Sequence, residues 1–300
     1  MMETTTLVNG QSTHSISIFD RGLAYGDGLF ETIALVNGQI QLWHLHKQRL
    51  LTGLLSLKLV ASNEEAESLL SDVVTDVKTG FDLFKQPNGV LKITITRGVG
   101  GRGYAPPIHT KLSRIIAFTP WPNGRDYLAR DGVTVRMCKH RWSQNSALVG
   151  LKHLNRLDQV IARSEWSDPD IHEGIMLNQQ AKVCSGAMSN LFVEFNGALL
   201  TPKLDNCGIH GTMAQFICSL AQDMQVEVIH TDITIEHMLE ADGLFLTNSI
   251  NGIWPVVKLH HSNHDGDAAT LSWSISELTN RLQKTLSDQL AKQPLVASVC

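Results

Sequence analysis

The sequence lacks long apolar runs and any surplus of basic residues. No stretch of about 18 consecutive apolar residues occurs, so we expect no transmembrane helix. The N-terminal sequence MMETTTLVNGQSTHSISIFDRG has no basic segment followed by an apolar run, so no signal peptide is predicted. The net charge of −4 leaves no basic surplus for nucleic acid. We therefore expect a protein with neither a membrane nor a nucleic-acid partner.

Cysteine is scarce, and its spacing excludes two classes of protein. The five cysteines are odd in number and show no CxxC spacing, which argues against a disulfide scaffold and against a paired-cysteine metal site. HExxH and EF-hand patterns are absent as well, so no metal is predicted. GxSxG is also missing, which leaves the α/β-hydrolase interpretation without a nucleophile. Free thiols in a reducing cytoplasm fit the cysteines, which are Cys138, Cys184, Cys207, Cys218 and Cys300.

The chain is long enough for two domains. Its 300 residues are 43% hydrophobic, which is enough apolar material for a sizeable core. A Pro-Asn-Gly cluster at 122–124 marks a boundary. We therefore predict a small N-terminal α+β domain over 1–120, a linker over 121–125 and a larger C-terminal α+β domain over 126–300.

Turn and helix signals are interspersed along the chain. Asn-Gly pairs between β-forming residues predict hairpins at 9–10, 37–38 and 196–197. Ser62 and Glu65 form a capping box that predicts the start of a helix. We also predict a helix over 153–165. Lys152 would then lie directly before the apolar face of this helix. The mixture favours an α+β fold over a regularly wound parallel sheet.

A glycine-rich stretch, RGVGGRGY at 97–104, follows a predicted strand. Its glycines fit GxGxxG, but Tyr104-Ala-Pro-Pro comes next and cannot open the helix that a dinucleotide site needs. Arg97, Arg102 and Tyr104 are better suited to binding carboxylates, since guanidinium groups bind them bidentately. The alternative is a plain glycine loop with solvated arginines.

Two further stretches carry hydrogen-bond donors. In GIHGTMAQF, Gly211 and Thr212 open a helix, so the amides of Thr212 and Met213 are suited to bind an anion at the positive helix end. In LFLTNSINGIWP, Asn248 and Ser249 end an apolar strand and supply amide and hydroxyl groups. Each of these signals is weak when it is taken alone.

Several stretches occur together in one order along nearly the whole chain. They are FDRGLAYGDGLFET, the helix with Arg49, GLKHLNRLDQV, SNLF, GIHGTMAQF and LTNSINGIWPV. In this combination the chain resembles the fold-type IV pyridoxal-phosphate (PLP) enzymes, which include branched-chain and D-amino-acid aminotransferases and aminodeoxychorismate lyases. ITRGVGGRGY and GLKHLNRLDQV look most like the lyases. The resemblance implies a two-domain α+β fold of the D-amino-acid aminotransferase type, a homodimer, and a PLP site between the domains with the C-terminal domain as the PLP-binding one.

The resemblance also implies roles for single residues. By composition alone Lys152 is a surface lysine whose stem packs on apolar residues. In this family it would instead bind the cofactor covalently and act as a base, and burial against Leu151 and Leu154 would favour its neutral form. Thr32 would help to protonate the departing group. The implied cofactor-binding residues are Lys152, Arg49, Ser185, Gly211, Thr212, Met213, Asn248 and Ser249, and the implied substrate-binding residues are Arg97, Arg102, Tyr104 and Phe30.

The implied activity is a lyase reaction on a small molecule. 4-Amino-4-deoxychorismate would lose the proton from the carbon that bears its amine, and elimination of the enolpyruvyl ether would give pyruvate and 4-aminobenzoate for folate synthesis. Aromatisation supplies a large driving force, so the enzyme mainly positions and deprotonates. The alternatives are a D-amino-acid or branched-chain aminotransferase on the same fold and a catalytically impaired PLP-binding homologue.

One residue departs from the family pattern. The family places a glutamate five residues before the asparagine of SNLF, where it pairs with the pyridine nitrogen of the cofactor. Counting back from Asn190 reaches Ser185, which cannot supply a negative charge and can only share a hydrogen bond. Transamination needs more carbanion delocalisation than elimination, so Ser185 favours the lyase over the aminotransferase.

Overall fold

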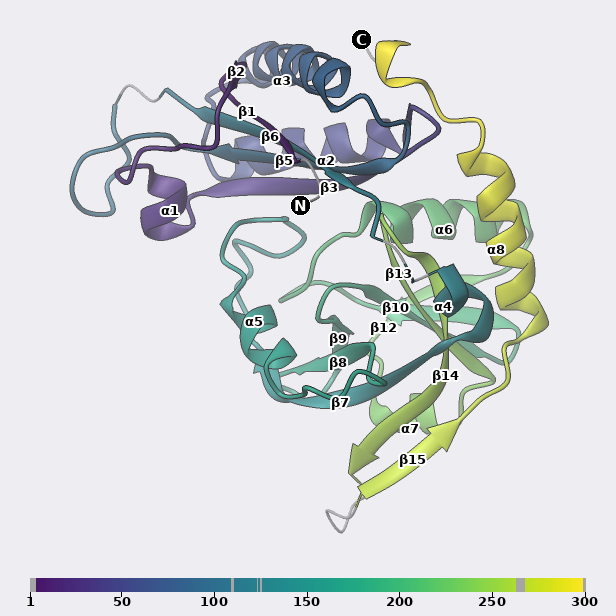
Figure 1. Cartoon of the computed structure of the whole chain (residues 1–300). Helices are drawn as coiled ribbons and strands as arrows, with labels where there is room; N and C mark the ends of the chain where they lie inside the picture. The colour runs from purple at the N-terminus through teal and green to yellow at the C-terminus, as the bar shows by residue number, and fades with distance from the viewer. Residues whose placement is uncertain (1–3, 109–110, 123, 125, 263–267, 299–300) are drawn as a thin grey trace. The chain divides into compact units, whose positions relative to one another are not determined.

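The computed structural model describes residues 4–108, 111–122, 124, 126–262 and 268–298. The chain divides into two compact units (Figure 1). Unit 1 comprises Met1–Pro122, Leu151–Asn155 and Lys292–Cys300, and unit 2 comprises Asn123–Gly150 and Arg156–Ala291. Two short segments that we expected in the C-terminal domain, 151–155 and 292–300, therefore belong to unit 1. Asn123 and Arg125 of the predicted linker, and Cys300, lie outside the described residues.

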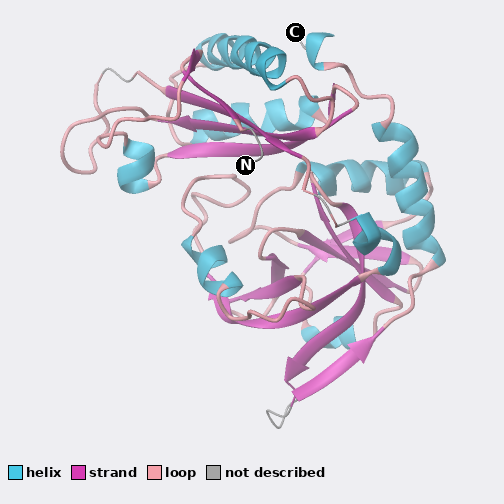
Figure 2. Cartoon of the chain, viewed as in Figure 1, coloured by secondary structure: helices cyan, strands magenta, loops and turns pink. Residues whose placement is uncertain are grey.

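Unit 1 is an antiparallel sheet covered by helices (Figure 2). Its strands pair in the order β2-β1-β6-β5-β3-β4. The strands are β1 (Thr5–Val8), β2 (Gln11–Ser12), β3 (Gly28–Val36), β4 (Gln39–Ile40), β5 (Gly89–Thr96) and β6 (Ser113–Pro120). The helices are α1 (Arg21–Tyr25), α2 (Trp43–Ser56), α3 (Asn63–Phe84) and the 3₁₀ helix η1 (Val296–Ser298).

One face of this sheet forms the core of unit 1. Alternate strand residues point to the same face, and Ile33, Ile93 and Ile116 of three neighbouring strands are fully buried there. Leu54 of α2 and Val73 of α3 pack into the same cluster. The apolar alternation of the strands therefore decides which face the two helices cover.

The hairpin and capping signals are confirmed. In each Asn-Gly pair, at 9–10, 37–38 and 196–197, both residues have a positive φ, between 50° and 52° for asparagine and between 73° and 82° for glycine. Two successive positive φ angles are what a two-residue hairpin turn needs, and these residues adopt them at low cost. Ser62 is the N-cap of α3, and its hydroxyl accepts a hydrogen bond from the amide of Glu65.

The predicted helix over 153–165 is wrong at its start. Helix α5 (Leu157–Arg163) begins four residues later, and residues 151–155 instead extend along the edge of β3. The amide of Phe30 donates to the carbonyl of Lys152 at 2.9 Å, and the amide of Leu154 donates to the carbonyl of Gly28 at 3.0 Å. Backbone pairing with a sheet edge outweighs the helical spacing of the leucines, because local preference yields to tertiary contacts.

Unit 2 is built on a mixed sheet. Its strands pair in the order β12-β11-β10-β13-β14-β7-β8-β9, and β15 pairs with β14. The strands are β7 (Val133–Trp142), β8 (Glu173–Asn178), β9 (Val183–Gly186), β10 (Asn190–Phe195), β11 (Ala198–Pro202), β12 (Val228–Thr231), β13 (Gly243–Asn248), β14 (Gly252–Ser262) and β15 (Ala268–Ser272). The helices are α4 (Asp126–Asp131), α5, α6 (Thr212–Asp223), α7 (Ile235–Leu239) and α8 (Glu277–Leu290).

The pattern in both units confirms the predicted α+β class. In unit 2, β7 runs parallel to β8 and β14, and β11 runs parallel to β12, while the hairpins around them are antiparallel. Helix α6 packs on β13 and α8, and it begins at Thr212 with Gly211 as its N-cap, as predicted. In the described part of the chain, no helix is both long and apolar enough to cross a membrane.

Candidate active site

Lys152 lies at the edge of the unit 1 sheet beside Phe30. Its Nζ is 4.5 Å from the centroid of the Phe30 ring. The Nζ of Lys92 is 5.3 Å from the same centroid. Phe30 and Thr32 are two residues apart in β3 and therefore share a face of the sheet, where Lys92 is the strand partner of Thr32. The structure thus brings together three residues that the sequence predicted for the site: Lys152, Phe30 and Thr32.

Two influences on the Lys152 amine oppose each other. The half-buried lysine follows Leu151, which is 6% exposed, and precedes the half-buried Leu154. Apolar surroundings favour the neutral amine. The face of the Phe30 ring attracts a cation and favours the ammonium form. The position is therefore suited to a group that changes its protonation state during a reaction.

Arg49 forms an ion pair in the core on the opposite face of β3. Glu31, which is 1% exposed, accepts a hydrogen bond from Arg49 Nε at 2.8 Å and a second from Arg49 Nη2. His46 Nδ1 lies 2.6 Å from the same carboxylate. His46 and Arg49 are three residues apart on α2 and so face β3 together. The buried carboxylate therefore holds Arg49 in one orientation.

The protonation states of this cluster follow from burial and charge. Burial raises the pKa of Glu31, but the positive charge of Arg49, together with the hydrogen bonds from Arg49 and His46, outweighs burial and brings the pKa down to about 2. Burial lowers the pKa of His46 below its ordinary value and outweighs the attraction of Glu31. At neutral pH Glu31 is therefore ionised, His46 is neutral, and Arg49 supplies the permanent positive charge.

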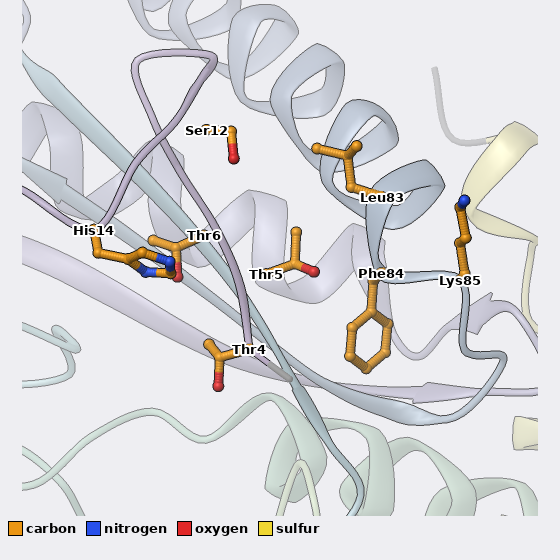
Figure 3. A pocket seen from close by; sticks show the side chains of 8 residues that line it. All are labelled: Thr4, Thr5, Thr6, Ser12, His14, Leu83, Phe84 and Lys85. Carbon is orange, nitrogen blue, oxygen red and sulfur yellow. The ribbon is translucent and has the colours of Figure 1, made fainter. Parts of the chain in front are cut away.

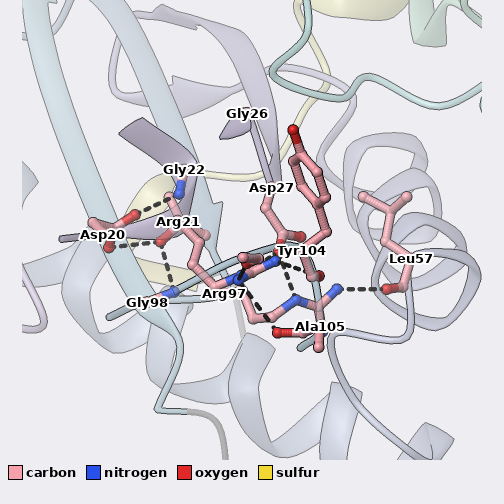
Figure 4. A network of polar contacts seen from close by, with 12 residues as sticks. Asp20, Arg21, Gly22, Gly26, Asp27, Leu57, Arg97, Gly98, Tyr104 and Ala105 are labelled. Carbon is pink, nitrogen blue, oxygen red and sulfur yellow. Dashed lines mark hydrogen bonds and ion pairs between the residues drawn. The ribbon is translucent and has the colours of Figure 1, made fainter. Parts of the chain in front are cut away.

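A second charge network lies at the base of the glycine-rich loop (Figure 4). Asp27 accepts hydrogen bonds from Arg21 Nε at 2.9 Å and from Arg97 Nε at 2.8 Å. Burial raises the pKa of Asp27, but the hydrogen bonds from Arg97 and Arg21 outweigh it and hold the pKa below its usual value. Arg97 also donates to the carbonyls of Leu57 and Lys58, both at 2.8 Å.

These contacts change the role expected for Arg97. Its side chain is 7% exposed, and its donors point at Asp27 and at the carbonyls that follow α2. Arg97 is therefore placed to anchor the base of the loop, and the structure does not support the expectation that it binds a substrate carboxylate. Arg102 and Tyr104 are exposed on the same loop.

Arg21 holds the loop that carries those two residues. Its guanidinium donates to the carbonyls of Gly103 and Tyr104, each at 3.0 Å. The rings of Tyr25 and Tyr104 pack edge to face with centroids 5.5 Å apart. Helix α1 and the loop therefore form one polar and aromatic assembly, in which Arg102 is presented to solvent.

In unit 2, the start of α6 requires a glycine. A Cβ at Gly211 would lie 1.9 Å from Oδ1 of Asn190, whose Nδ2 donates to the carbonyl of Ile209 at 3.0 Å. Thr212 and Met213 are each 2% exposed. A glycine at the N-cap has no side chain of its own to cap the first amides. The amides and the positive end of the helix dipole are therefore suited to bind an anion.

The turn after β13 is shaped by Asn248. Its Oδ1 accepts hydrogen bonds from the amides of Ile250 at 3.0 Å and Asn251 at 2.8 Å. Its Nδ2 donates to the carbonyl of Met188 at 3.3 Å. The side chain of Asn248 therefore fixes the turn that carries Ser249 and ties it to the segment before β10.

Ser185 is buried, and a carboxylate that the sequence did not predict, Glu173, lies near the next residue, Gly186. Ser185 is 3% exposed, and its hydroxyl donates to the carbonyl of Gly186 at 2.7 Å. Glu173, on the neighbouring strand β8, accepts hydrogen bonds from the amide of Met188 at 3.0 Å and the hydroxyl of Ser189 at 2.9 Å. Burial raises the pKa of Glu173, although these hydrogen bonds oppose the rise. The carboxylate holds the turn that follows Ser185.

A pocket of about 340 Å³ lies elsewhere in unit 1, beside the β1–β2 hairpin and the end of α3 (Figure 3). Its lining residues are Thr4, Thr5, Thr6, Ser12, His14, Leu83, Phe84 and Lys85. None of them belongs to the predicted site, so this pocket is not the candidate active site.

Comparison with known proteins identifies the family. The model of the amino-transferase class IV family matches residues 28–259. The chain belongs to this family. It is 30% identical to an aminodeoxychorismate lyase from Vibrio harveyi over 93% of this chain and 98% of that protein. A solved 4-amino-4-deoxychorismate lyase from Pseudomonas aeruginosa has a TM-score of 0.84 at 37% identity, covering 95% of this chain and 99% of that one. A D-alanine aminotransferase from Listeria monocytogenes is 26% identical over 82% of each chain.

Membership of the class IV family confirms the predicted family and its fold. Several charged residues around the candidate site residues were not, however, identified from the sequence. These are Arg21, Asp27, Glu31, His46 and Glu173. Glu31 had a visible signal, because it is the only acid in the run GLFETIALV and therefore needs a partner when the strand is buried. His46 and Arg49 follow at helical spacing and supply that partner. Glu173 carried no comparable signal, because its donors come from a turn that forms only after folding.

The Glu31 cluster makes stability depend on pH in a defined window. Because folding lowers the pKa of Glu31 from about 4.5 to about 2, its stabilisation is complete above pH 4.5 and is lost as the pH falls towards 2. We expect the free energy of unfolding of the wild type to fall by about 3 kcal/mol more than that of Glu31→Gln between pH 5 and pH 2. Urea titrations at a series of pH values measure this difference.

Glu67→Gln serves as the control for that experiment, because Glu67 pairs with Lys47 at the surface and is 51% exposed. It should keep the wild-type pH profile. Equal pH slopes for the wild type and Glu31→Gln would show that folding does not shift the pKa of this carboxylate.

The Asp27 network predicts how firmly the loop is held. In Asp27→Asn, both arginines lose their charged partner, so the loop should open more often. We expect trypsin to cut the Arg102–Gly103 bond about tenfold faster than in the wild type, a ratio equal to about 1.4 kcal/mol. Mass spectrometry identifies the cut. Asp131→Asn, which breaks an exposed pair with Arg130, should leave the cleavage rate unchanged, and an unchanged rate in Asp27→Asn would contradict the role of the network.

Proposed function

We propose that the protein is a PLP-dependent aminodeoxychorismate lyase, which converts 4-amino-4-deoxychorismate to 4-aminobenzoate and pyruvate. The observation that carries the proposal is the placement of Lys152 on the edge of β3, with its amine over the ring of Phe30; Thr32 lies on the same face of that strand as Phe30. The likeness to lyases from Vibrio harveyi and Pseudomonas aeruginosa over nearly the whole chain supports it.

The residues present fit the cofactor. Lys152 offers an amine, and Arg49 and the start of α6 offer partners for a phosphate. Gly211, as the N-cap of α6, brings no side chain of its own that would cap the first amides of the helix, which suits them to an anion. Because Glu31 already offsets the charge of Arg49, we propose that the helix amides and the turn at Asn248 and Ser249 carry a large share of phosphate binding.

In the proposed mechanism, different residues of the chain carry out the separate proton transfers. The bound cofactor supplies an electron sink for the carbon that bears the substrate amine. Lys152 Nζ takes the proton from that carbon, and its mixed apolar and aromatic surroundings let it exist as amine and as ammonium. Thr32, on the same face of β3, donates a proton to the departing enolpyruvyl group. Arg102 and Tyr104 bind the substrate carboxylates from the loop that Arg21 holds.

Ser185 supports elimination over transamination. Its hydroxyl donates to the carbonyl of Gly186, and Ser185 would bring no negative charge to the pyridine nitrogen of a bound cofactor. Glu173 is the nearby acid, and the turn of Met188 and Ser189 occupies its carboxylate. A reaction whose leaving group departs early needs less carbanion stabilisation than transamination, which is why we propose the lyase.

The test is a pyruvate-release assay on 4-amino-4-deoxychorismate with added PLP. We expect turnover and a visible absorbance band from the protein-bound cofactor, and Lys152→Ala should lose the band and roughly 10³-fold in rate. Lys92→Ala is the matched control for cofactor attachment, because Lys92 lies over the same ring and should leave the band in place.

Three results would contradict the proposal in different ways. Full lyase turnover in Lys152→Ala would remove the lysine from the mechanism. Faster transamination of D-alanine or branched-chain amino acids than pyruvate release would make the protein an aminotransferase. Bound PLP without either activity would make it a catalytically impaired homologue.

We further propose that the protein is a cytoplasmic homodimer, for which the four described free thiols and a patch around α1 are the support. Ile18, Phe19, Leu23, Val99 and Tyr104 are all more than half exposed. The backbone of Asp20 pairs with that of Val99, and Tyr104 packs on Tyr25, so these apolar side chains gather in one region of unit 1. An exposed apolar patch of this kind is typical of a protein interface.

A double variant tests the dimer. We expect sedimentation to give a dimer for the wild type and a monomer for Phe19→Glu with Leu23→Glu, because two charges would be buried in the contact. Tyr127→Glu, at an exposed position on α4 of unit 2, should remain dimeric. A monomeric wild type, or a double variant that stays dimeric, would contradict the proposed interface.

A further inference from the structure

Two thiols of unit 2 lie in direct contact. The Sγ atoms of Cys184 and Cys207 are 2.8 Å apart and form a hydrogen bond. Cys184 is in β9 next to Ser185, and Cys207 is in the segment that connects β11 to α6. Both side chains are buried, at 2% and 7% exposure. The contact therefore joins two segments that are 23 residues apart in the sequence.

The two thiols differ in chemical character. The S–H of Cys184 is held by its bond to Cys207 and by burial, and both raise its pKa. The same hydrogen bond lowers the pKa of Cys207 below its ordinary value and outweighs burial. A thiolate is the form that attacks an oxidant, and a neighbouring thiol can then resolve the product. Cys207 follows the exposed Asp205 and Asn206 in the sequence, although its own side chain is buried.

The geometry demands little movement for a covalent bond. A disulfide holds its sulfur atoms about 2.05 Å apart, so the pair has to close by less than about 1 Å. Among the described residues, neither Cys138, in the same apolar cluster, nor Cys218, on α6, forms a thiol–thiol hydrogen bond of this kind. This pair therefore differs from the other described cysteines in its direct thiol contact and in the opposite pKa shifts of its two thiols, and not in burial alone.

We propose that Cys184 and Cys207 are an oxidisable dithiol, which a peroxide converts to a disulfide that cross-links β9 to the segment before α6. The Cys207 thiolate attacks the peroxide to give a sulfenic acid and hydroxide. The Cys184 thiol then forms the S–S bond as water leaves. In total, two thiols are oxidised, each losing one hydrogen, and one hydrogen peroxide is reduced to two waters.

The cross-link would restrain the two parts of unit 2 that carry Ser185 and Gly211. Closing a loop of this length limits the unfolded chain and raises stability. The oxidised protein should therefore unfold at a temperature about 5–10 °C above that of the reduced protein. This consequence concerns the protein itself and holds whether or not the proposed lyase activity is correct.

The experiment treats the full, folded protein with hydrogen peroxide and digests it without reduction. Trypsin and chymotrypsin together cut between Cys207 and Cys218, after Phe216, so mass spectrometry can assign the link. We expect one linked peptide pair, Cys184 with Cys207, lighter than the reduced pair by two hydrogens. A thiol reductant should reverse both the link and the rise in unfolding temperature.

Matched variants separate this pair from the other thiols. Cys138→Ser should still form the link, whereas Cys184→Ser and Cys207→Ser should not. The peptide analysis of the wild type needs no variant, so a variant that fails to fold does not affect the test. Oxidation of Cys207 to sulfinic acid without a link, a link to Cys218 instead, or a link that forms only in denaturant would each overturn the proposal.

Discussion

Backbone pairing between residues 151–155 and the edge of β3 is the constraint on which the Lys152 site depends. Two hydrogen bonds, Phe30 to Lys152 and Leu154 to Gly28, place this segment in unit 1, although the chain on both sides of it belongs to unit 2. The pairing sets the amine over the Phe30 ring. Pairing with a strand edge fixes both the direction of the paired segment and its register along the strand. A helix terminus or a free loop does not fix both together.

Buried acids hold the rest of the site in place. Glu31 orients Arg49, Asp27 joins Arg21 to Arg97, and Glu173 holds the turn after Ser185. Each carboxylate costs desolvation; the donors aimed at Glu31 and Asp27 outweigh that cost, whereas those at Glu173 only oppose it. Removing one partner leaves a charge without compensation, so each of these residues matters for the local geometry that it holds.

Much of the fold was predictable because its signals are local. The Asn-Gly turns are set by left-handed backbone conformations that few other residues adopt, and the Ser62 cap is set by a side-chain hydrogen bond to a nearby amide. The site was predictable only where a motif carried it, as for Lys152 and Gly211. From the sequence, Arg97 was assigned to substrate binding because of its charge. In the structure its guanidinium donates hydrogen bonds to Asp27 and to two backbone carbonyls.

The amino-acid sequence was sufficient for the family and for the α+β class, because the order of the motifs and the residues of the turns can be read directly from the chain. Three features needed the tertiary structure: the strand pairing of 151–155, the partners of the buried acids, and the contact between Cys184 and Cys207. All three join residues that are distant in the sequence. Local preferences cannot specify such contacts, since they form only when the sheets of each unit bring separate segments together.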